Sequence, residues 1–181
     1  MHFAGPIRAA GGTAQALAVL IADMIRRELN IGHYQPTDPE VERVKEEFGL
    51  YRGNLQYRPS PQEIDEIVRA CPVMINGEST ERIECAGYGN VRNIDEARIR
   101  GGVLLVIGEG MCLKAPKIQK HTERLSVPGW DFIAQFAARG KEVEVPGEDR
   151  FKSQQIQPIT KFMKDIICLL YTSPSPRDGR E

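Results

Sequence analysis

The stretch of sequence that matters most for the fold is residues 11–27, which read GGTAQALAVLIADMIRR. Thr13 can cap a helix here, and the apolar residues after it recur at the three- and four-residue spacing of one helix side. The stripe expected to face the core consists of Leu17, Leu20, Ile21, Met24 and Ile25. A ridge of small residues, which would let another backbone approach closely, consists of Ala14, Ala18 and Ala22. The stretch therefore predicts a long amphipathic helix.

Two further helices are predicted from capping boxes, in which a Ser or Thr is followed three residues later by a Glu. Thr37 with Glu40 begins one helix and Ser60 with Glu63 begins the other, and a proline stands in the first turn of both. The first of these helices is expected to bury Val41, Val44 and Phe48. The second is expected to bury Ile64, Ile67, Val68 and Cys71.

A small sheet is predicted after the third helix. Residues 73–75 have the composition of a short strand, Asn76-Gly77 suits the turn of a hairpin, and residues 81–86 alternate as a partner strand would. This pattern indicates an α+β fold, with several amphipathic helices packed on a small β-hairpin or sheet. A KH-like arrangement is compatible with it, although residues 5–8 and 108–110 do not form a clean Gly-x-x-Gly loop.

The region after the sheet is expected to be helical. Residues 101–111 keep a helical spacing of apolar side chains, although residues 103–107 taken alone would also suit a buried strand. Pro116 should kink or split this helix, which then continues to Leu125. A last short helix after Pro128 is expected to direct inward Trp130, Ile133, and Phe136 or Ala137.

The chain changes character near its C-terminal end. Residues 1–138 are expected to form the α+β region, residues 139–149 a charged linker, and residues 150–167 the helical start of a further segment. Residues 168–178 read CLLYTSPSPRD, which resembles the translation of a widely used transposase sequencing adaptor. We therefore expect residues 168–181 to be foreign to the natural protein and exclude them from the fold.

The charges of the chain nearly balance. The sequence has 24 Lys and Arg against 25 Asp and Glu, a formal net charge of −1. This balance excludes a protein that is basic overall, but it leaves room for a local basic stripe that contacts nucleic acid. No apolar run approaches the roughly 20 residues of a membrane span, and the N-terminus lacks a signal-peptide pattern. We expect a cytoplasmic protein without a membrane partner.

The first candidate site is the turn that precedes the first predicted helix, where Arg8, Gly11, Gly12 and Thr13 come together in sequence. Backbone amides at a helix N-terminus, helped by a guanidinium, favour a phosphate group. The glycine spacing matches neither a P-loop nor a Gly-x-Gly-x-x-Gly fingerprint. A purely structural turn and cap therefore stays open beside a phosphate contact, and a small phosphate-binding enzyme is one functional alternative.

The second candidate site is a basic stripe. Lys114, Lys117 and Arg124 share one side of the predicted helix with His121, and Lys120 lies beside them. Such a stripe could follow the phosphate backbone of a nucleic acid. The alternative is an ordinary solvated helix face.

No residue is predicted to be catalytic or to bind a metal. The four cysteines are 14, 27 and 56 residues apart, without the close ligand pair that zinc sites usually have. Glu109 lies in an apolar run without an identifiable partner for acid–base chemistry. Small buried thiols and a structural carboxylate are the simpler interpretations.

Five stretches of the chain are more specific as a set than any of them alone. They are FAGPIR (3–8) with GGTAQAL (11–17), LQYRPSP (55–61), RGG (100–102) with EG (109–110), KAPKI (114–118) and GW (129–130). In this order and spacing they resemble the N-terminal region of the large subunit of the archaeal D-family DNA polymerase, DNA polymerase II. The resemblance covers residues 3–167.

The resemblance implies that residues 1–138 are an accessory region of a replicative DNA-directed DNA polymerase. It implies DNA as a partner, together with a small subunit that carries a 3′–5′ exonuclease. The family's catalytic Mg²⁺ is held by an acidic motif, Asn-Ala-Asp-x-Asp, which this chain lacks. The fragment alone is therefore expected to be inactive and without a cofactor of its own. The alternative is a stand-alone nucleic-acid-binding module without enzymatic activity.

Overall fold

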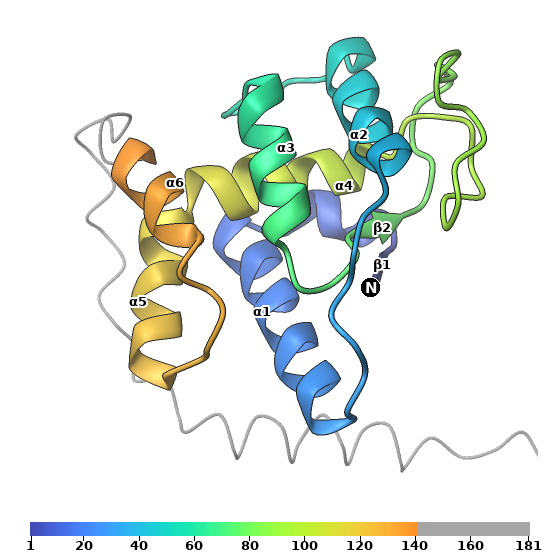
Figure 1. The fold of residues 1–181 in the computed structure, drawn as a ribbon. Coiled ribbons are helices and arrows are strands. Elements are labelled where there is room, and N and C mark those ends of the chain that lie inside the picture. Colours follow the sequence, from blue (N-terminus) through green and yellow to red (C-terminus); the bar gives the residue numbers. More distant parts are fainter. Residues whose placement is uncertain (141–181) are drawn as a thin grey trace, which may run out of the picture. The chain divides into compact units, whose positions relative to one another are not determined.

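The structure, a computed structural model, describes residues 1–140, which fold mainly into helices and belong to one compact unit, residues 1–144 (Figure 1). The helices include a 3₁₀ turn, η1, and a π-helical segment, η2. In chain order the elements are β1 (His2–Phe3), η1 (Gly5–Ala9), α1 (Gly12–Glu28), α2 (Asp38–Leu50), α3 (Pro61–Ala70), β2 (Asn76–Gly77), α4 (Gly101–Leu105), η2 (Val106–Leu113), α5 (Ala115–Leu125) and α6 (Ile133–Gly140).

The helix predicted from residues 11–27 is present as α1, but its buried side differs from the predicted one. Of the predicted stripe only Leu20 is buried, whereas Ile25 is 41% exposed. The buried side of α1 consists of Gln15, Ala16, Val19, Leu20 and Asp23. Asp23 can face inward because its Oδ2 accepts hydrogen bonds from Trp130 Nε1 and Arg27 Nε, at 2.9 and 2.8 Å. Apolar spacing alone cannot reveal a polar residue that is paired in this way.

The two capping boxes are confirmed. Glu40 Oε2 accepts a hydrogen bond from the Thr37 backbone N–H at 2.7 Å, where α2 begins. Glu63 Oε2 accepts from the Ser60 backbone N–H at 2.8 Å, where α3 begins. The buried apolar residues of these helices are those predicted, Val41, Val44, Phe48, Ile64 and Ile67, with Cys71 buried and Val68 partly buried.

The predicted hairpin at Asn76-Gly77 is wrong, although a small sheet is present and the α+β class is confirmed. These two residues are not a turn: they form β2, which pairs in parallel with β1 at the start of the chain. His2 lies opposite Asn76 and Phe3 opposite Gly77. The local preference of Asn-Gly for a turn is overridden here by backbone pairing with a strand more than 70 residues away. A KH-like arrangement stays a prediction.

The helical reading of residues 101–125 is confirmed. α4, η2 and α5 follow one another directly, and Pro116 stands in the first turn of α5, where its missing N–H costs nothing. The last predicted helix is α6, which begins at Ile133, so Trp130 lies in the turn before it. The predicted inward residues Trp130, Ile133, Phe136 and Ala137 are all at most 1% exposed. These side chains join a core that α1 and η2 share.

The remaining predictions about domain organisation concern the C-terminal part of the chain. Arg139 and Gly140 complete α6. The rest of the predicted linker, the predicted helical segment 150–167 and the adaptor-like residues 168–181 lie outside the described residues. Within residues 1–140, no helix combines the length and the apolar character that a bilayer span requires.

Candidate nucleic-acid interface

The basic stripe lies on the solvent side of α5. The helix turns Ala115, Ile118 and Thr122 toward the core. Lys117, Lys120 and Arg124 are exposed on the other side, and Lys114 and His121 are half-buried at its margin. The three- and four-residue spacing thus places the predicted cations along one exposed helix surface, as the sequence indicated.

These four cations have no acidic partner among the described residues, a property that they share with some other basic residues, such as Arg82 and Arg92. Within the described part of the chain, no carboxylate lies within 4.0 Å of Lys114, Lys117, Lys120 or Arg124. Lys45, by contrast, contacts two carboxylates, at 2.7 and 2.9 Å. Positive charge on the α5 surface is therefore not neutralised locally, so it remains available to an external anion.

The N-terminus of α1 is the second part of the candidate interface. Its N-cap residue is Gly11, and no side chain caps the helix. The prediction that Thr13 is the cap is wrong, because Thr13 lies within the first helical turn. Since no side chain accepts from the first-turn amides, the positive end of the helix dipole is not compensated there.

Gly12 brings the two candidate regions together. A Cβ on this glycine would lie 2.5 Å from the carbonyl oxygen of Glu109 and 3.2 Å from Cγ of Lys114. Only glycine therefore fits this close approach of α1 to the π-helical segment η2. The consequence for the site is that Lys114 lies beside the uncapped start of α1, next to the stripe on α5. We call Gly11, Gly12, Thr13, Lys114, Lys117, Lys120 and Arg124 the basic surface.

Arg8 is engaged elsewhere. Its guanidinium forms an ion pair with Glu81 at 3.4 Å, and its side chain is 43% exposed. This pair directs Arg8 toward the segment that follows β2, so Arg8 is left out of the basic surface.

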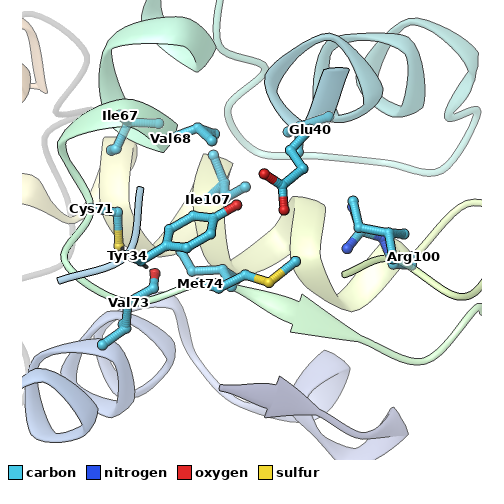
Figure 2. Close-up of a pocket in the computed structure, with 12 residues that line it drawn as sticks. Tyr34, Glu40, Ile67, Val68, Cys71, Val73, Met74, Arg100 and Ile107 are labelled. Atoms are coloured by element: carbon cyan, nitrogen blue, oxygen red, sulfur yellow. Dashed lines mark hydrogen bonds between the residues drawn. The ribbon is translucent and has the colours of Figure 1, made fainter. Parts of the chain in front are cut away.

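A cavity between α2, α3 and the segment that leads to β2 is too small for a substrate (Figure 2). It has a volume of about 20 Å³, which is room for one water molecule, and its walls are mainly apolar. Tyr34, Glu40, Cys71 and Arg100 are the ionisable groups that Figure 2 shows beside its aliphatic side chains. Burial raises the pKa of the Cys71 thiol to about 12, so this thiol is not a nucleophile at neutral pH.

A larger hollow of about 290 Å³ lies between the end of α5 and the start of α6. Its lining includes Glu123 of α5 and Asp131 of the turn before α6, both exposed, and none of the lysines of the basic surface. Acidic residues at the rim disfavour the binding of a phosphate group, so we do not include this hollow in the candidate nucleic-acid interface.

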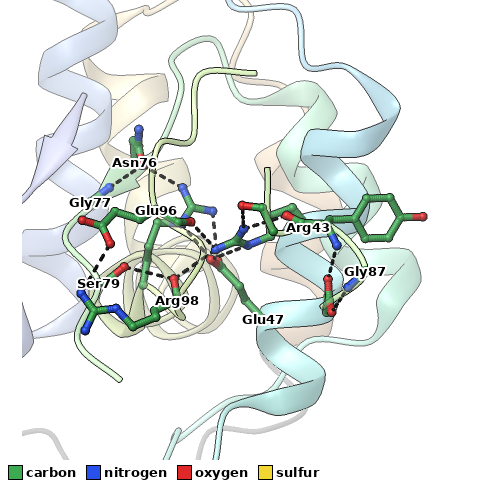
Figure 3. Close-up of polar contacts among 12 residues, drawn as sticks. Arg43, Glu47, Asn76, Gly77, Ser79, Gly87, Glu96 and Arg98 are labelled. Atoms are coloured by element: carbon green, nitrogen blue, oxygen red, sulfur yellow. Dashed lines mark hydrogen bonds and ion pairs between the residues drawn. The ribbon is translucent and has the colours of Figure 1, made fainter. Parts of the chain in front are cut away.

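A buried cluster of charges organises the segment between β2 and α4 (Figure 3). Glu47 accepts hydrogen bonds from Arg43 Nε at 3.0 Å and from Arg100 Nε at 2.9 Å, and all three side chains are at most 1% exposed. Arg43 also donates to four backbone carbonyls, those of Tyr88, Gly89, Glu96 and Arg98. Because these donors are used up inside the fold, the cluster is structural, and sequence reasoning did not identify it.

The comparisons with known proteins agree on one family. A family model described as "DNA polymerase II large subunit DP2, N-terminal" matches residues 1–139. The chain belongs to the DNA polymerase II large subunit family. The archaeal resemblance read from the five stretches is thereby confirmed.

Relatives that carry the name DNA polymerase II large subunit are similar over nearly the whole chain. The protein of Methanocella arvoryzae is 47% identical over 170 residues, which are 93% of this chain and 15% of the relative. That of Methanococcoides burtonii is 47% identical over 185 residues, and that of Archaeoglobus fulgidus 44% over 183; each alignment covers 99% of this chain and 16% of the relative. The chain therefore spans about 15–16% of the length of these large subunits.

The stretches that carry the resemblance to the DNA polymerase II large subunit meet at η2. Glu109 accepts a hydrogen bond from the Gln56 backbone N–H at 2.9 Å, which joins LQYRPSP to the π-helical segment. A Cβ on Gly108 would lie 2.8 Å from the carbonyl oxygen of Tyr57, so this contact also requires glycine. With Gly12 and Lys114, four of the five stretches thus come together beside the basic surface. This shared position could not be read from their spacing in the sequence.

Proposed function

We propose that this chain is an N-terminal accessory region of the large subunit of a replicative DNA-directed DNA polymerase, and that its basic surface contacts the phosphate backbone of DNA. The observation that carries the DNA contact is the row of unpaired cations on α5 beside the uncapped start of α1. Family membership supplies the setting, because the relatives are named as polymerase subunits.

The physical argument rests on spacing and charge. At 1.5 Å of rise per residue, Lys117 and Arg124 are about 10 Å apart along the helix axis. Duplex DNA carries one negative charge for roughly every 1.7 Å of its axis, so several phosphates lie within reach of such a stripe. Lysine and arginine without a fixed base-reading partner contact phosphate rather than base edges. We therefore expect binding that is independent of DNA sequence.

In the intact subunit, the proposed reaction is template-directed nucleotidyl transfer, for which Mg²⁺ would supply charge stabilisation at the phosphates. Residues 1–140 do not bring together three or more His, Cys, Asp or Glu side chains that could hold a metal. The residues present do not fit such a site, so we assign this region a role in positioning DNA and none in chemistry. The proposed partner within the polymerase is the small, exonuclease-bearing subunit, and the proposed location is the cytoplasm.

The test is binding of the 181-residue chain to a labelled DNA duplex, measured by fluorescence anisotropy between about 50 and 200 mM salt. Four phosphate contacts predict a slope of log K against log salt of about −3 to −4. The double variant Lys117→Glu with Lys120→Glu should weaken binding and reduce that slope by about two.

The matched control reverses two exposed cations outside the basic surface, Arg82→Glu with Arg92→Glu, and changes the net charge equally. If both double variants weaken binding to the same extent, the contact is a general charge effect and the basic surface is not the site. If the unaltered chain does not bind the duplex at the lowest salt, the DNA contact is overturned as well.

A further inference from the structure

Helix α1 is apolar on two opposite sides, and only one of them faces the core. The core side carries Ala16, Val19 and Leu20, all at most 1% exposed. The opposite side carries a second row at four-residue spacing, which consists of Leu17, Ile21, Ile25 and Leu29. Ile25 is 41% exposed and Leu29, the C-cap residue that follows α1, is 63% exposed. Ile21 is half-buried, and Leu17 is half-buried because its side chain also packs against the core. We call these four residues the outer row of α1.

The outer row has the properties of an interface. Over twelve residues it extends for about 18 Å along the helix, and Ile31, 56% exposed, follows it in the chain. Ala14 lies exposed beside the row, whereas Ala18 and Ala22 are partly buried against the core. Figure 1 shows α1 extending past α2 and α3 at its C-terminal end. Exposed apolar side chains that form a row along one side of a helix mark a surface that a partner covers.

The charges near the outer row argue against nucleic acid as its occupant. Arg26 is held by Asp23 Oδ1 at 2.7 Å and also donates to the carbonyl of Ile31. Arg27 is held by the other oxygen of Asp23 and by the carbonyl of Pro128. Both guanidiniums are thus committed within the fold, and Glu28, which is exposed next to the row, would repel phosphate.

The length of the relatives indicates what covers the row. Residues aligned with this chain make up only 15–16% of the large subunits of Methanocella arvoryzae and Methanococcoides burtonii. We infer that the outer row of α1 is an intramolecular docking surface, which packs against an apolar helix face in the remainder of the large subunit. This inference is independent of the proposed DNA contact, because the outer row and the basic surface share no residue.

The experiment measures the exposure of the outer row with and without the remainder of the subunit. In a chimeric large subunit, residues 1–139 of this chain replace the aligned residues of the Methanocella arvoryzae protein. The substitution Leu29→Cys in this chimera provides a thiol for maleimide labelling. The same substitution is made in the 181-residue chain, and Arg92→Cys, at an exposed position of the same unit, is the control. Peptide mass spectrometry assigns the label to its site.

We expect the thiol at position 29 to react at least tenfold more slowly in the chimeric subunit than in the 181-residue chain, and the thiol at position 92 to react equally in both. Equal rates at position 29 would overturn the inference. The inference would also be overturned if position 29 is protected only when the small subunit is present. The same holds if its protection in the 181-residue chain increases with protein concentration, because a dimer would then be the occupant. If the chimera is insoluble, the same thiol is labelled in the 181-residue chain with and without a Methanocella arvoryzae large subunit from which the aligned residues have been deleted. Slower labelling of position 29 in the presence of that subunit supports the inference, and an unchanged rate overturns it.

A second pair of variants separates this inference from the proposed function. Lys117→Glu with Lys120→Glu should abolish most DNA binding but leave the protection at position 29 unchanged. Ile25→Glu in the 181-residue chain should leave DNA binding unchanged, since the outer row shares no residue with the basic surface. Failure of the docking surface and failure of the DNA contact therefore give different results.

Discussion

Two regions of this molecule bury their backbone in different ways. Around η2, helices pack through apolar side chains and close glycine contacts, and the backbone hydrogen bonds are satisfied within each helix. Residues 78–100 have almost no regular structure, and four of their carbonyls accept hydrogen bonds from the buried guanidinium of Arg43 (Figure 3). One region depends on many small apolar contacts, whereas the other depends mainly on hydrogen bonds, of which the buried Arg43 makes the largest share and Glu46 adds two more. The two should therefore respond very differently to single substitutions.

The largest expected effect is in the charged cluster. Glu47→Gln removes the carboxylate that pairs with both Arg43 and Arg100, whose side chains are at most 1% exposed. Loss of one partner leaves buried charge uncompensated, which typically costs about 3–5 kcal/mol in the free energy of unfolding. Urea denaturation followed by circular dichroism measures this change.

The control for the cluster is Glu42→Gln, because Glu42 pairs with Lys45 at the surface and its side chain is 42% exposed. Such a pair contributes about 1 kcal/mol or less. If the two variants lose similar stability, residues 78–100 are not held by the buried cluster, and the comparison between the regions fails.

The next effect is at the helical junction. Gly12→Ala places a methyl group 2.5 Å from the carbonyl oxygen of Glu109, so α1 and η2 must move apart. Overpacking of this kind costs about 1–3 kcal/mol. Gly49→Ala is the matched control, since Gly49 lies in α2 with no atom within 4 Å of the added Cβ. It should stabilise the protein by roughly 0.5–1 kcal/mol, because alanine is the better helix former. Thermal unfolding of both variants tests the opposite signs.

The third effect depends on pH and concerns the contact between α1 and the loop before α6. Burial alone would raise the pKa of Asp23, but hydrogen bonds from Trp130, Arg27 and Arg26 outweigh it and lower the pKa below 3.8. The stability that ionised Asp23 contributes is therefore present above about pH 4 and is lost as the pH falls through the lower pKa of the folded state.

Asp23→Asn should destabilise the protein by about 1.5–3 kcal/mol at neutral pH, the range for hydrogen bonds to a charged group. The difference in free energy of unfolding between the two proteins should shrink as the pH falls below 4. A difference that stays constant with pH would show that Asp23 is not the group that titrates.

Much of the helical architecture could be predicted because its signals are local. The boxes at Thr37 and Ser60 join residues three positions apart, and the spacing of Ile64 and Ile67 reports the buried side directly. The basic stripe on α5 was predicted for the same reason, since residues three and four apart share a helix side. Its position next to Gly12 was not predicted, because that contact joins α1 to the helix after η2.

The sequence by itself determined the helices, the capping boxes of α2 and α3, the spacing of the basic stripe and the family, because each depends on neighbours within a few residues or on the order of short motifs. Only the tertiary structure decided which side of α1 is buried, that Asn76-Gly77 is a strand rather than a turn, and what holds residues 78–100. In each of these cases a polar group or a backbone edge finds its partner 45 to 107 residues away. The free energy of burying a charge or an N–H depends on that partner, so the local pattern alone cannot predict the outcome.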